Sequence, residues 1–532
     1  MALPCGAGAD AEKAPGSALR AKAGKKPVLT VFLMMAATLI SKILGMLRTV
    51  LYASHYGTTP AASAFSAASR IPLTFFDLLF SAAVVGCFIP VYNSFEKEQE
   101  EEASAFALTF LNLIFLATGL LALLGILFAD SLIAVVTPGL DPETAALAAR
   151  LLRMLFPMII FTGEAYTLVG ILQSEDRFLL PAVVSSVSNL GVILYFLIFD
   201  KALGQNGVYG LAAAYVFSWL LQFLTLAIPL LLSGKRYRPV FQLKNPALKK
   251  ALRMTLPIMA GSWLAPLASL TGAHFSSLLA SNGNAVFDYS YNIYIIVAGV
   301  LTYSICNYVF PSLSRTAGNP EEFHNTVQTG LLSALAITVP FTAAVMLLAG
   351  EGVTVLYFRN EFTAADVSQT AAMLRLNAAA LPAFAVTELG MRVFYAKKTT
   401  LVPVLAACLG AAVNLLAASA VRTLPGIGAA CAAGQLAAAA VLLFAMLRTE
   451  RPVFNRTFLL DFLRILAAAL LSAAVMYGMR LLFPGDPTAR GMLHNLLICA
   501  AVFLPGGTVF LLTLKISRAS FLRPQKGGIT SS

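Results

Sequence analysis

The chain has 532 residues, of which 58% are hydrophobic and only 12% are charged, and its mean hydropathy is +0.80. A soluble protein of this length carries about 25% charged residues, so the composition excludes a soluble globular protein and predicts a polytopic membrane protein. The net charge of +12 does not indicate nucleic-acid binding. Lys and Arg collect in the cytoplasmic loops of membrane proteins, and the sequence holds no basic–aromatic nucleic-acid motif.

A polar, basic segment at 1–28 opens the chain. It lacks the apolar region of a signal peptide, and we interpret it as a cytoplasmic tail. A spanning helix needs about 20 mainly apolar residues, and fourteen segments of the sequence meet this requirement. They are 29–54, 64–92, 104–135, 145–173, 179–199, 207–233, 251–280, 286–312, 325–349, 368–396, 400–421, 425–447, 458–482 and 492–515.

The distribution of basic residues orients these spans. With the N-terminus inside, 24 Lys and Arg fall in or beside the inner loops and tails, against four in the outer loops. The densest group lies in a basic linker at 234–250, and a second tail follows at 516–532. The positive-inside rule therefore predicts a multi-pass protein of the bacterial cytoplasmic membrane with both termini in the cytoplasm.

An internal repeat divides the spans into two halves. Similar prolines and small-residue patterns recur in the same order at an offset of 218–225 residues, as with Pro90 and Pro311, or Pro157 and Pro382. We therefore expect an all-α fold with two pseudo-symmetric six-helix lobes, at 29–233 and 251–447, and an added helix pair at 448–515. Parallel repeats are related by an axis along the membrane normal, with a cavity between them near the midplane.

Charges inside the first two spans are the strongest indication of a site. Lys42 and Arg48 lie in the first span, and Arg70 and Asp77 lie in the second. A charge at the centre of a membrane helix costs about 2.5–3.5 kcal/mol on insertion scales, so such residues usually face a watery cavity or a polar ligand. Lys42 and Arg48 lie about 120° apart around their helix and could border one broad cavity. The alternative is that either side chain snorkels to the membrane interface.

Among the other charged residues of the predicted spans, Glu388, Arg392 and Glu164 are candidates for an ion or proton site or for a structural pair. Glu388 and Arg392 form an i,i+4 pair in the favourable order, which we interpret as mainly structural. Glu164 is the repeat counterpart of Glu388 without a comparable Arg, and it is a candidate cation or proton site.

The sequence contains no pattern that indicates an enzyme or a metal site. The four His and six Cys are dispersed, and no zinc-protease, P-loop or serine-nucleophile motif occurs. The loops between the spans are too short for a soluble catalytic domain. We expect no catalytic residue, no metal and no cofactor, apart from a coupling ion or the membrane potential as an energy source.

Several motifs resemble the MurJ/MviN flippase family of the multidrug/oligosaccharidyl-lipid/polysaccharide exporter superfamily. These motifs are SKILGMLRT in the first span, GTT in the following turn, AFSAASRIP and CFIPVY in the second span, and PSLSR after the eighth. The resemblance extends over nearly the whole chain and includes the fourteen spans and the terminal helix pair. It implies translocation of lipid II, the undecaprenyl-pyrophosphate-linked peptidoglycan precursor, by alternating access, with a cationic cavity for the pyrophosphate.

The resemblance also assigns residues and shows departures from the family pattern. Lys42 and Arg48 stand at the positions of two cavity arginines, and Arg70 stands at the basic position before Pro72. The acids of the family pattern are replaced by Thr49 and Ser63, and two further arginines by Phe76 and Asn292. We include Asn292 among the candidate substrate-binding residues.

Two alternative transport functions remain open at this point. They are export of another undecaprenyl-linked saccharide and cation-coupled drug antiport within the same superfamily. The expected partners are the membrane, the lipid-linked saccharide and the cell-wall synthesis machinery.

Overall fold

The computed structural model describes residues 27–81, 87–95, 99–175, 177–232, 237–517 and 519. Most of the predicted tail at 1–28, nearly all of the tail at 516–532 and residues 234–236 of the predicted linker lie outside these residues. Within the described residues the elements are helices and turns, with no β-strand. The prediction of an all-α membrane protein is confirmed.

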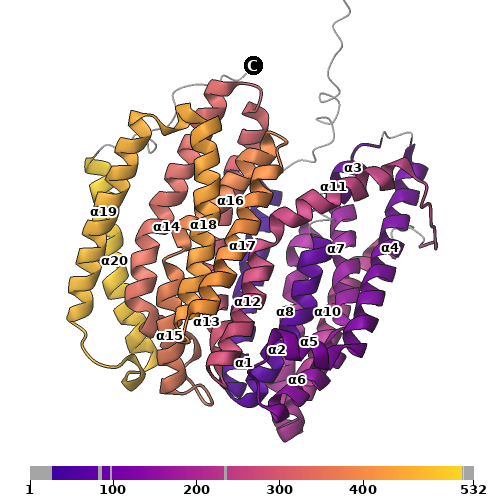
Figure 1. Ribbon diagram of the computed structural model, residues 1–532, viewed down its shortest axis with the longest axis horizontal. Helices are drawn as coiled ribbons and strands as arrows, with labels where there is room; N and C mark the ends of the chain where they lie inside the picture. Colours follow the sequence, from indigo (N-terminus) through magenta and orange to yellow (C-terminus); the bar gives the residue numbers. More distant parts are fainter. Residues whose placement is uncertain are drawn as a thin grey trace, which may run out of the picture.

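The helices of the N-terminal half form one group on one side of the molecule (Figure 1). Helix α8 packs against α1 and α10, α2 packs against α6, and α7 packs against α4 and α10. The elements of this half are α1 (Pro27–Tyr56), α2 (Pro60–Phe76), the π-helical turn η2 (Asp77–Ser81), α3 (Ile89–Tyr92), α4 (Glu100–Leu127), α5 (Ala129–Val136), α6 (Pro142–Leu155), α7 (Met158–Ser174), α8 (Leu179–Ile198), α9 (Asp200–Leu203), η5 (Gly204–Asn206) and α10 (Gly207–Leu232).

Most of the remaining helices form a second group, with α19 and α20 on its outer flank, whereas α11 runs across one end of the first group beside α3 (Figure 1). Helices α19 and α20 pack against each other and against α14. The elements are α11 (Pro246–Ser262), α12 (Leu264–Leu279), α13 (Gly283–Thr316), α14 (Pro320–Tyr357), α15 (Ala364–Ala378), α16 (Leu381–Ala396), α17 (Leu401–Ala420), α18 (Gly426–Thr449), η6 (Arg451–Phe454), α19 (Arg456–Leu481), η7 (Pro487–Ala489) and α20 (Met492–Ile516).

Several helices begin at a polar cap followed by proline. The side chains of Thr59, Asp141, Asn245 and Asn319 each accept a hydrogen bond from a backbone N–H in the first turn of α2, α6, α11 and α14. Proline suits the next position, because its missing N–H has no partner in the first turn of a helix. These dipeptides fix where four helices start.

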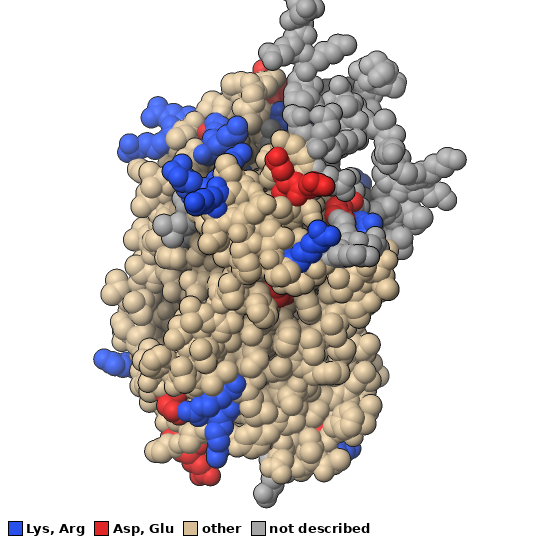
Figure 2. Space-filling view, turned by 90° about the vertical axis from the view of Figure 1, so that its right-hand side faces the viewer, with Lys and Arg blue, Asp and Glu red and all other residues tan. Residues whose placement is uncertain are grey.

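Among the described residues, ten helices are long and apolar enough to cross a membrane. Two bent pairs, α6 with α7 at 41° and α15 with α16 at 47°, bring the number to twelve if each pair is one span. The bends fall beside Pro157 and Pro382, the prolines that the repeat aligns. Figure 2 shows a broad band with little charge across one face, with most Lys, Arg, Asp and Glu toward its two ends.

The predicted spans 64–92 and 251–280 are the two that neither a single long helix nor one of these bent pairs provides. The first becomes π-helical at Asp77, and the second is divided at Trp263 into α11 and α12. The two breaks touch each other, because the indole N–H of Trp263 donates a hydrogen bond of 3.0 Å to the Leu78 carbonyl. Broken helices are tolerated at membrane depth where protein or a water-filled cavity covers the free backbone groups.

Candidate functional site

A cavity of about 390 Å³ lies between α1, α8 and α13. It brings together Lys42, Arg48 and Asn292, three of the residues predicted to bind substrate. The full lining is Thr38, Ser41, Lys42, Gly45, Arg48 and Thr49 of α1, Pro181, Ala182, Ser185 and Asn189 of α8, and Asn292 and Ile296 of α13. The cavity is therefore bounded by helices from both halves of the chain.

In the part of the chain that the structure describes, the two cations of this cavity form no ion pair with an acid. The salt bridges among the described residues include none to Lys42 or Arg48. The Arg48 guanidinium carbon lies 5.5 Å from the ring centre of Tyr215, and its Nε is buried without a hydrogen-bond partner among the described residues. Thr49 bonds to the Gly45 carbonyl of its own helix (3.1 Å). The cavity thus presents positive charge that an anion could neutralise.

Amide and hydroxyl groups complete the opposite wall. Asn189 of α8 donates from Nδ2 to the Ser41 carbonyl (3.2 Å), which holds α8 against α1 beside Lys42. Ser185 and Asn292 also face the cavity. These groups can exchange hydrogen bonds with polar groups of a ligand whose charge is held by the two cations.

Arg70 lies outside this cavity, in a buried cluster between α2, α12 and α13. It forms an ion pair with Asp288, and its NH1 donates to Ser269 Oγ at 2.6 Å. Ser66 Oγ donates to the other Asp288 oxygen at 3.0 Å, and the Arg70 guanidinium carbon lies 4.9 Å from the ring centre of Phe287. Arg70 is 8% exposed. Its charge is therefore already paired within the protein.

The Arg70 cluster is part of a wider polar contact at one end of the molecule. Asn284 Nδ2 donates to the Ser63 carbonyl (3.1 Å), and the Tyr289 hydroxyl donates to the Gly57 carbonyl (2.7 Å). Asn360 Nδ2 donates to Ser54 Oγ (2.7 Å). We call this end, where the turn at 57–59 meets the turns at 280–282 and 358–363, the closed end.

The hydrogen bonds between α2 and α13 join residues that are 218, 221 and 222 positions apart. These separations fall within the 218–225 offset of the sequence repeat. Residues that the sequence repeat makes nearly equivalent are therefore neighbours where α2 meets α13. The pairing of Arg70 with Asp288 follows from this geometry.

The other predicted residues lie elsewhere in the fold. Asp77 opens the π-helical turn and does not line the cavity. Glu164 is 7% exposed, and its Oε1 has no hydrogen-bond partner among the described residues. Glu388 Oε2 lies 2.7 Å from Arg392 NH1 in the expected i,i+4 pair. Phe76 is buried against Phe80 and Tyr166, so it presents no charge where the family pattern has an arginine.

The sequence did not lead us to predict three residues of the site and its surroundings, Ser185, Asn189 and Asp288. Asn189 and Ser185 lie in a span without buried charge, so nothing in its hydropathy sets them apart. Asp288 is different, because it precedes Asn292 by four residues and lies 218 residues after Arg70. Applying the repeat offset to Arg70 would have identified it.

The sequence matches the family described as "Lipid II flippase MurJ" over residues 52–493. "Probable lipid II flippase MurJ" of Bdellovibrio bacteriovorus is 29% identical over 447 residues, or 82% of this chain and 85% of that protein. The protein with this name in Aquifex aeolicus is 26% identical, with coverages of 69% and 71%.

Solved structures share the fold. "Lipid II flippase MurJ, inward closed conformation" superposes with a TM-score of 0.76 at 22% identity, covering 91% of this chain and 100% of that one. An inward-facing multidrug resistance MATE family transporter of the MOP superfamily gives 0.67 at 17% identity, covering 80% and 99%. Because the family match extends over most of the sequence and the fold agrees, this chain belongs to the MurJ family of lipid II flippases.

Proposed function

We propose that this protein translocates lipid II across the cytoplasmic membrane, with the pyrophosphate held in the cavity between α1, α8 and α13. The observation that carries the proposal is the pair of cations, Lys42 and Arg48, that face this cavity without an acidic partner among the described residues. A diphosphate brings the negative charge that such a cavity lacks. The predicted function as a lipid II flippase agrees with the family to which the chain belongs.

The two cations have different chemistry. The Arg48 guanidinium is planar and can donate two parallel hydrogen bonds to phosphate oxygens, whereas the Lys42 ammonium acts as a compact point charge. Asn292 stands where the family pattern has an arginine and supplies an uncharged donor instead. Helix α1 therefore provides the charged contacts to the pyrophosphate, and α8 and α13 contribute neutral polar groups.

We infer that transport proceeds by alternating access between two six-helix lobes, at 29–233 and 251–447. The polar contacts at the closed end support this proposal, because its hydrogen bonds and the Arg70–Asp288 ion pair can be exchanged for contacts with water when that end opens. The charge asymmetry of the loops supports an outer location for this end. The substrate would then enter from the cytoplasmic side, and α19 and α20 would supply an apolar path for the isoprenoid tail.

We include the full topology in the proposal, with fourteen spans and both termini in the cytoplasm. The segments 64–92 and 251–280 would each count as one broken span, which raises twelve to fourteen. Discontinuous helices near the midplane are common at transporter binding sites, and Asp77 and Trp263 lie at the two breaks.

The test is leaflet-resolved accessibility of lipid II in cells whose only flippase is this protein. We expect Arg48→Ala to abolish the outward appearance of lipid II at normal protein abundance, and Arg48→Lys to restore part of it. Arg150→Ala is the matched control, because Arg150 is exposed on α6. Normal lipid II export by Arg48→Ala would exclude the proposed role of the cavity, and failure of the unaltered protein would exclude lipid II as its substrate.

A further inference from the structure

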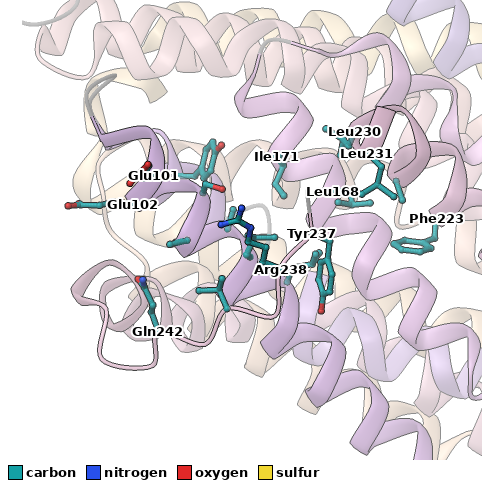
Figure 3. A pocket seen from close by; sticks show the side chains of 18 residues that line it. Glu101, Glu102, Leu168, Ile171, Phe223, Leu230, Leu231, Tyr237, Arg238 and Gln242 are labelled. Carbon is teal, nitrogen blue, oxygen red and sulfur yellow. The ribbon is translucent and has the colours of Figure 1, made fainter. Parts of the chain in front are cut away.

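A second and larger cavity, of about 1040 Å³, lies between α4, α7, α10 and the segment 237–242 (Figure 3). It shares no lining residue with the cavity that contains Lys42 and Arg48. Its volume lies just above the usual range of ligand sites, roughly 300–1,000 Å³. The proposed transport cycle makes no use of it.

One wall of this cavity is fixed by hydrogen bonds to α4. The Tyr237 hydroxyl donates to Asn112 Oδ1 (2.6 Å), and Asn112 Nδ2 donates to the Val240 carbonyl (2.9 Å). The Gln242 backbone N–H donates to Thr109 Oγ1 (3.1 Å). Thr109 and Asn112 are buried and lie three residues apart on one helix face. These bonds hold the non-helical segment against α4, so the cavity is preformed.

The lining divides into an apolar part and a charged part. Leu168 of α7 and Phe223 and Leu230 of α10 lie on one side, and Glu101 and Glu102 of α4 lie on the other (Figure 3). The side chain of Arg238 projects between the two parts (Figure 3). A ligand that fills the cavity must therefore combine an apolar chain with a polar head.

The charges restrict the head group further. Arg238 favours a phosphate, but Glu101 and Glu102 would repel a ligand that carries only negative charge. A head group that carries both a phosphate and an ammonium can pair with Arg238 through the first group and with Glu101 and Glu102 through the second. The site also lies at the end of the molecule opposite the closed end, where the loop charges place the cytoplasmic leaflet, and pockets between helices on this side are known to bind lipid head groups.

We propose that this cavity binds one zwitterionic aminophospholipid of the cytoplasmic leaflet. Its phosphate pairs with Arg238, its ammonium pairs with Glu101 and Glu102, and one acyl chain lies along Leu168 and Phe223. The bound lipid covers the non-helical segment 237–242, which would otherwise meet the membrane beside α4. This site is separate from the transport cavity and does not depend on the identity of the transported lipid.

The test is native mass spectrometry of the purified full-length protein with added phosphatidylethanolamine or phosphatidylglycerol. We expect phosphatidylethanolamine to be retained more strongly. Arg238→Ala should weaken its binding about tenfold to a hundredfold, because a hydrogen bond to a charged group is lost. Glu101→Gln with Glu102→Gln should remove the preference for phosphatidylethanolamine over phosphatidylglycerol.

Ala227→Trp tests the cavity itself, because Ala227 lines it and a large side chain there should exclude the acyl chain of either lipid. Arg456→Ala is the control, since Arg456 is an exposed cation at the start of α19, and it should change nothing. Size-exclusion profiles and thermal unfolding without added lipid verify the fold of each variant. Equal retention of the two lipids by the unaltered protein, undiminished binding by folded Ala227→Trp, or an equal loss in Arg456→Ala would each overturn the proposal.

Discussion

The ion pair between Arg70 and Asp288 makes a sharp prediction about the closed end. Asp288→Asn preserves the shape of the side chain but removes its charge, and it leaves Arg70 beside Ser269 and Phe287. When the closed end opens, Arg70 meets water, so the substitution costs little in that state. We therefore expect the variant to shift the equilibrium toward opening.

The size of the shift follows from the burial of the pair. Breaking a fully buried ion pair costs about 3–5 kcal/mol, but the Asp288 side chain is 26% exposed while that of Arg70 is 6% exposed. Allowing for this exposure, we expect about 2 kcal/mol, which corresponds to about a thirtyfold change in the equilibrium constant.

The assay uses a thiol at the closed end. Ser63 is fully buried there, so Ser63→Cys, in a chain whose six native cysteines are replaced, should react slowly with an impermeant maleimide added from outside. Asp288→Asn should raise the labelling rate at least tenfold. Asp461→Asn is the control, because it breaks an ion pair within α19 (2.7 Å to Arg464) far from this end. Unchanged labelling would refute the assignment of this pair to the closed state.

A double substitution separates the pair from its surroundings. If Arg70 and Asp288 act together, Arg70→Gln with Asp288→Asn should shift the equilibrium by less than the sum of the single effects, by about 0.5–3 kcal/mol. Strict additivity would show that the two residues act on the closed end independently.

Three further predictions concern stability and closure. Glu388→Ala should lower the amount of folded protein more than its specific transport activity, because it removes the i,i+4 partner on α16; normal abundance with lost transport would contradict the structural role. Gly57→Ala should raise thiol labelling in the same assay, because φ is +50° and a Cβ would lie 2.2 Å from the Glu361 carbonyl oxygen; unchanged labelling would mean that the turn relaxes at no cost. Glu351→Gln should lower the thermal stability of the protein, because Glu351 is 1% exposed and pairs with Arg480 of α19 at 2.7 Å; an unchanged melting temperature would show that this pair does not hold α19 against α14.

Hydropathy located most helices because apolar length is a direct requirement of the membrane. It could not locate the breaks at Asp77 and Trp263, since a π-helical turn and a divided helix have the same apolar composition as a continuous one. The start of α11 at Pro246, rather than at residue 251, follows from the cap at Asn245. Caps are local signals, and reading them would have corrected this boundary.

For the candidate site, too, the sequence identified some features and could not identify others. Lys42 and Arg48 could be selected from the sequence because a charge inside a membrane span is costly and therefore stands out. Their common cavity depends on how α8 and α13 pack against α1, which no spacing within α1 reveals. Arg70 satisfied the same criterion, yet its charge is neutralised by Asp288 of another helix. The cost of a buried charge identifies a residue that needs a partner, and only the packing tells whether that partner is the protein or a ligand.

Helix α11 limits how the two groups of helices can move. Gln242 is bonded to α4 three residues before the cap of α11, and α11 itself packs against α17 of the second group. Its 17 residues make a rod about 25 Å long that cannot shorten without losing hydrogen bonds. If the groups approach each other at the end opposite the closed end, this rod must swing or straighten. At the junction between α11 and α12, the indole of Trp263 contacts the π-helical turn of the first group. A rotation of α11 about this junction would therefore displace the other broken span.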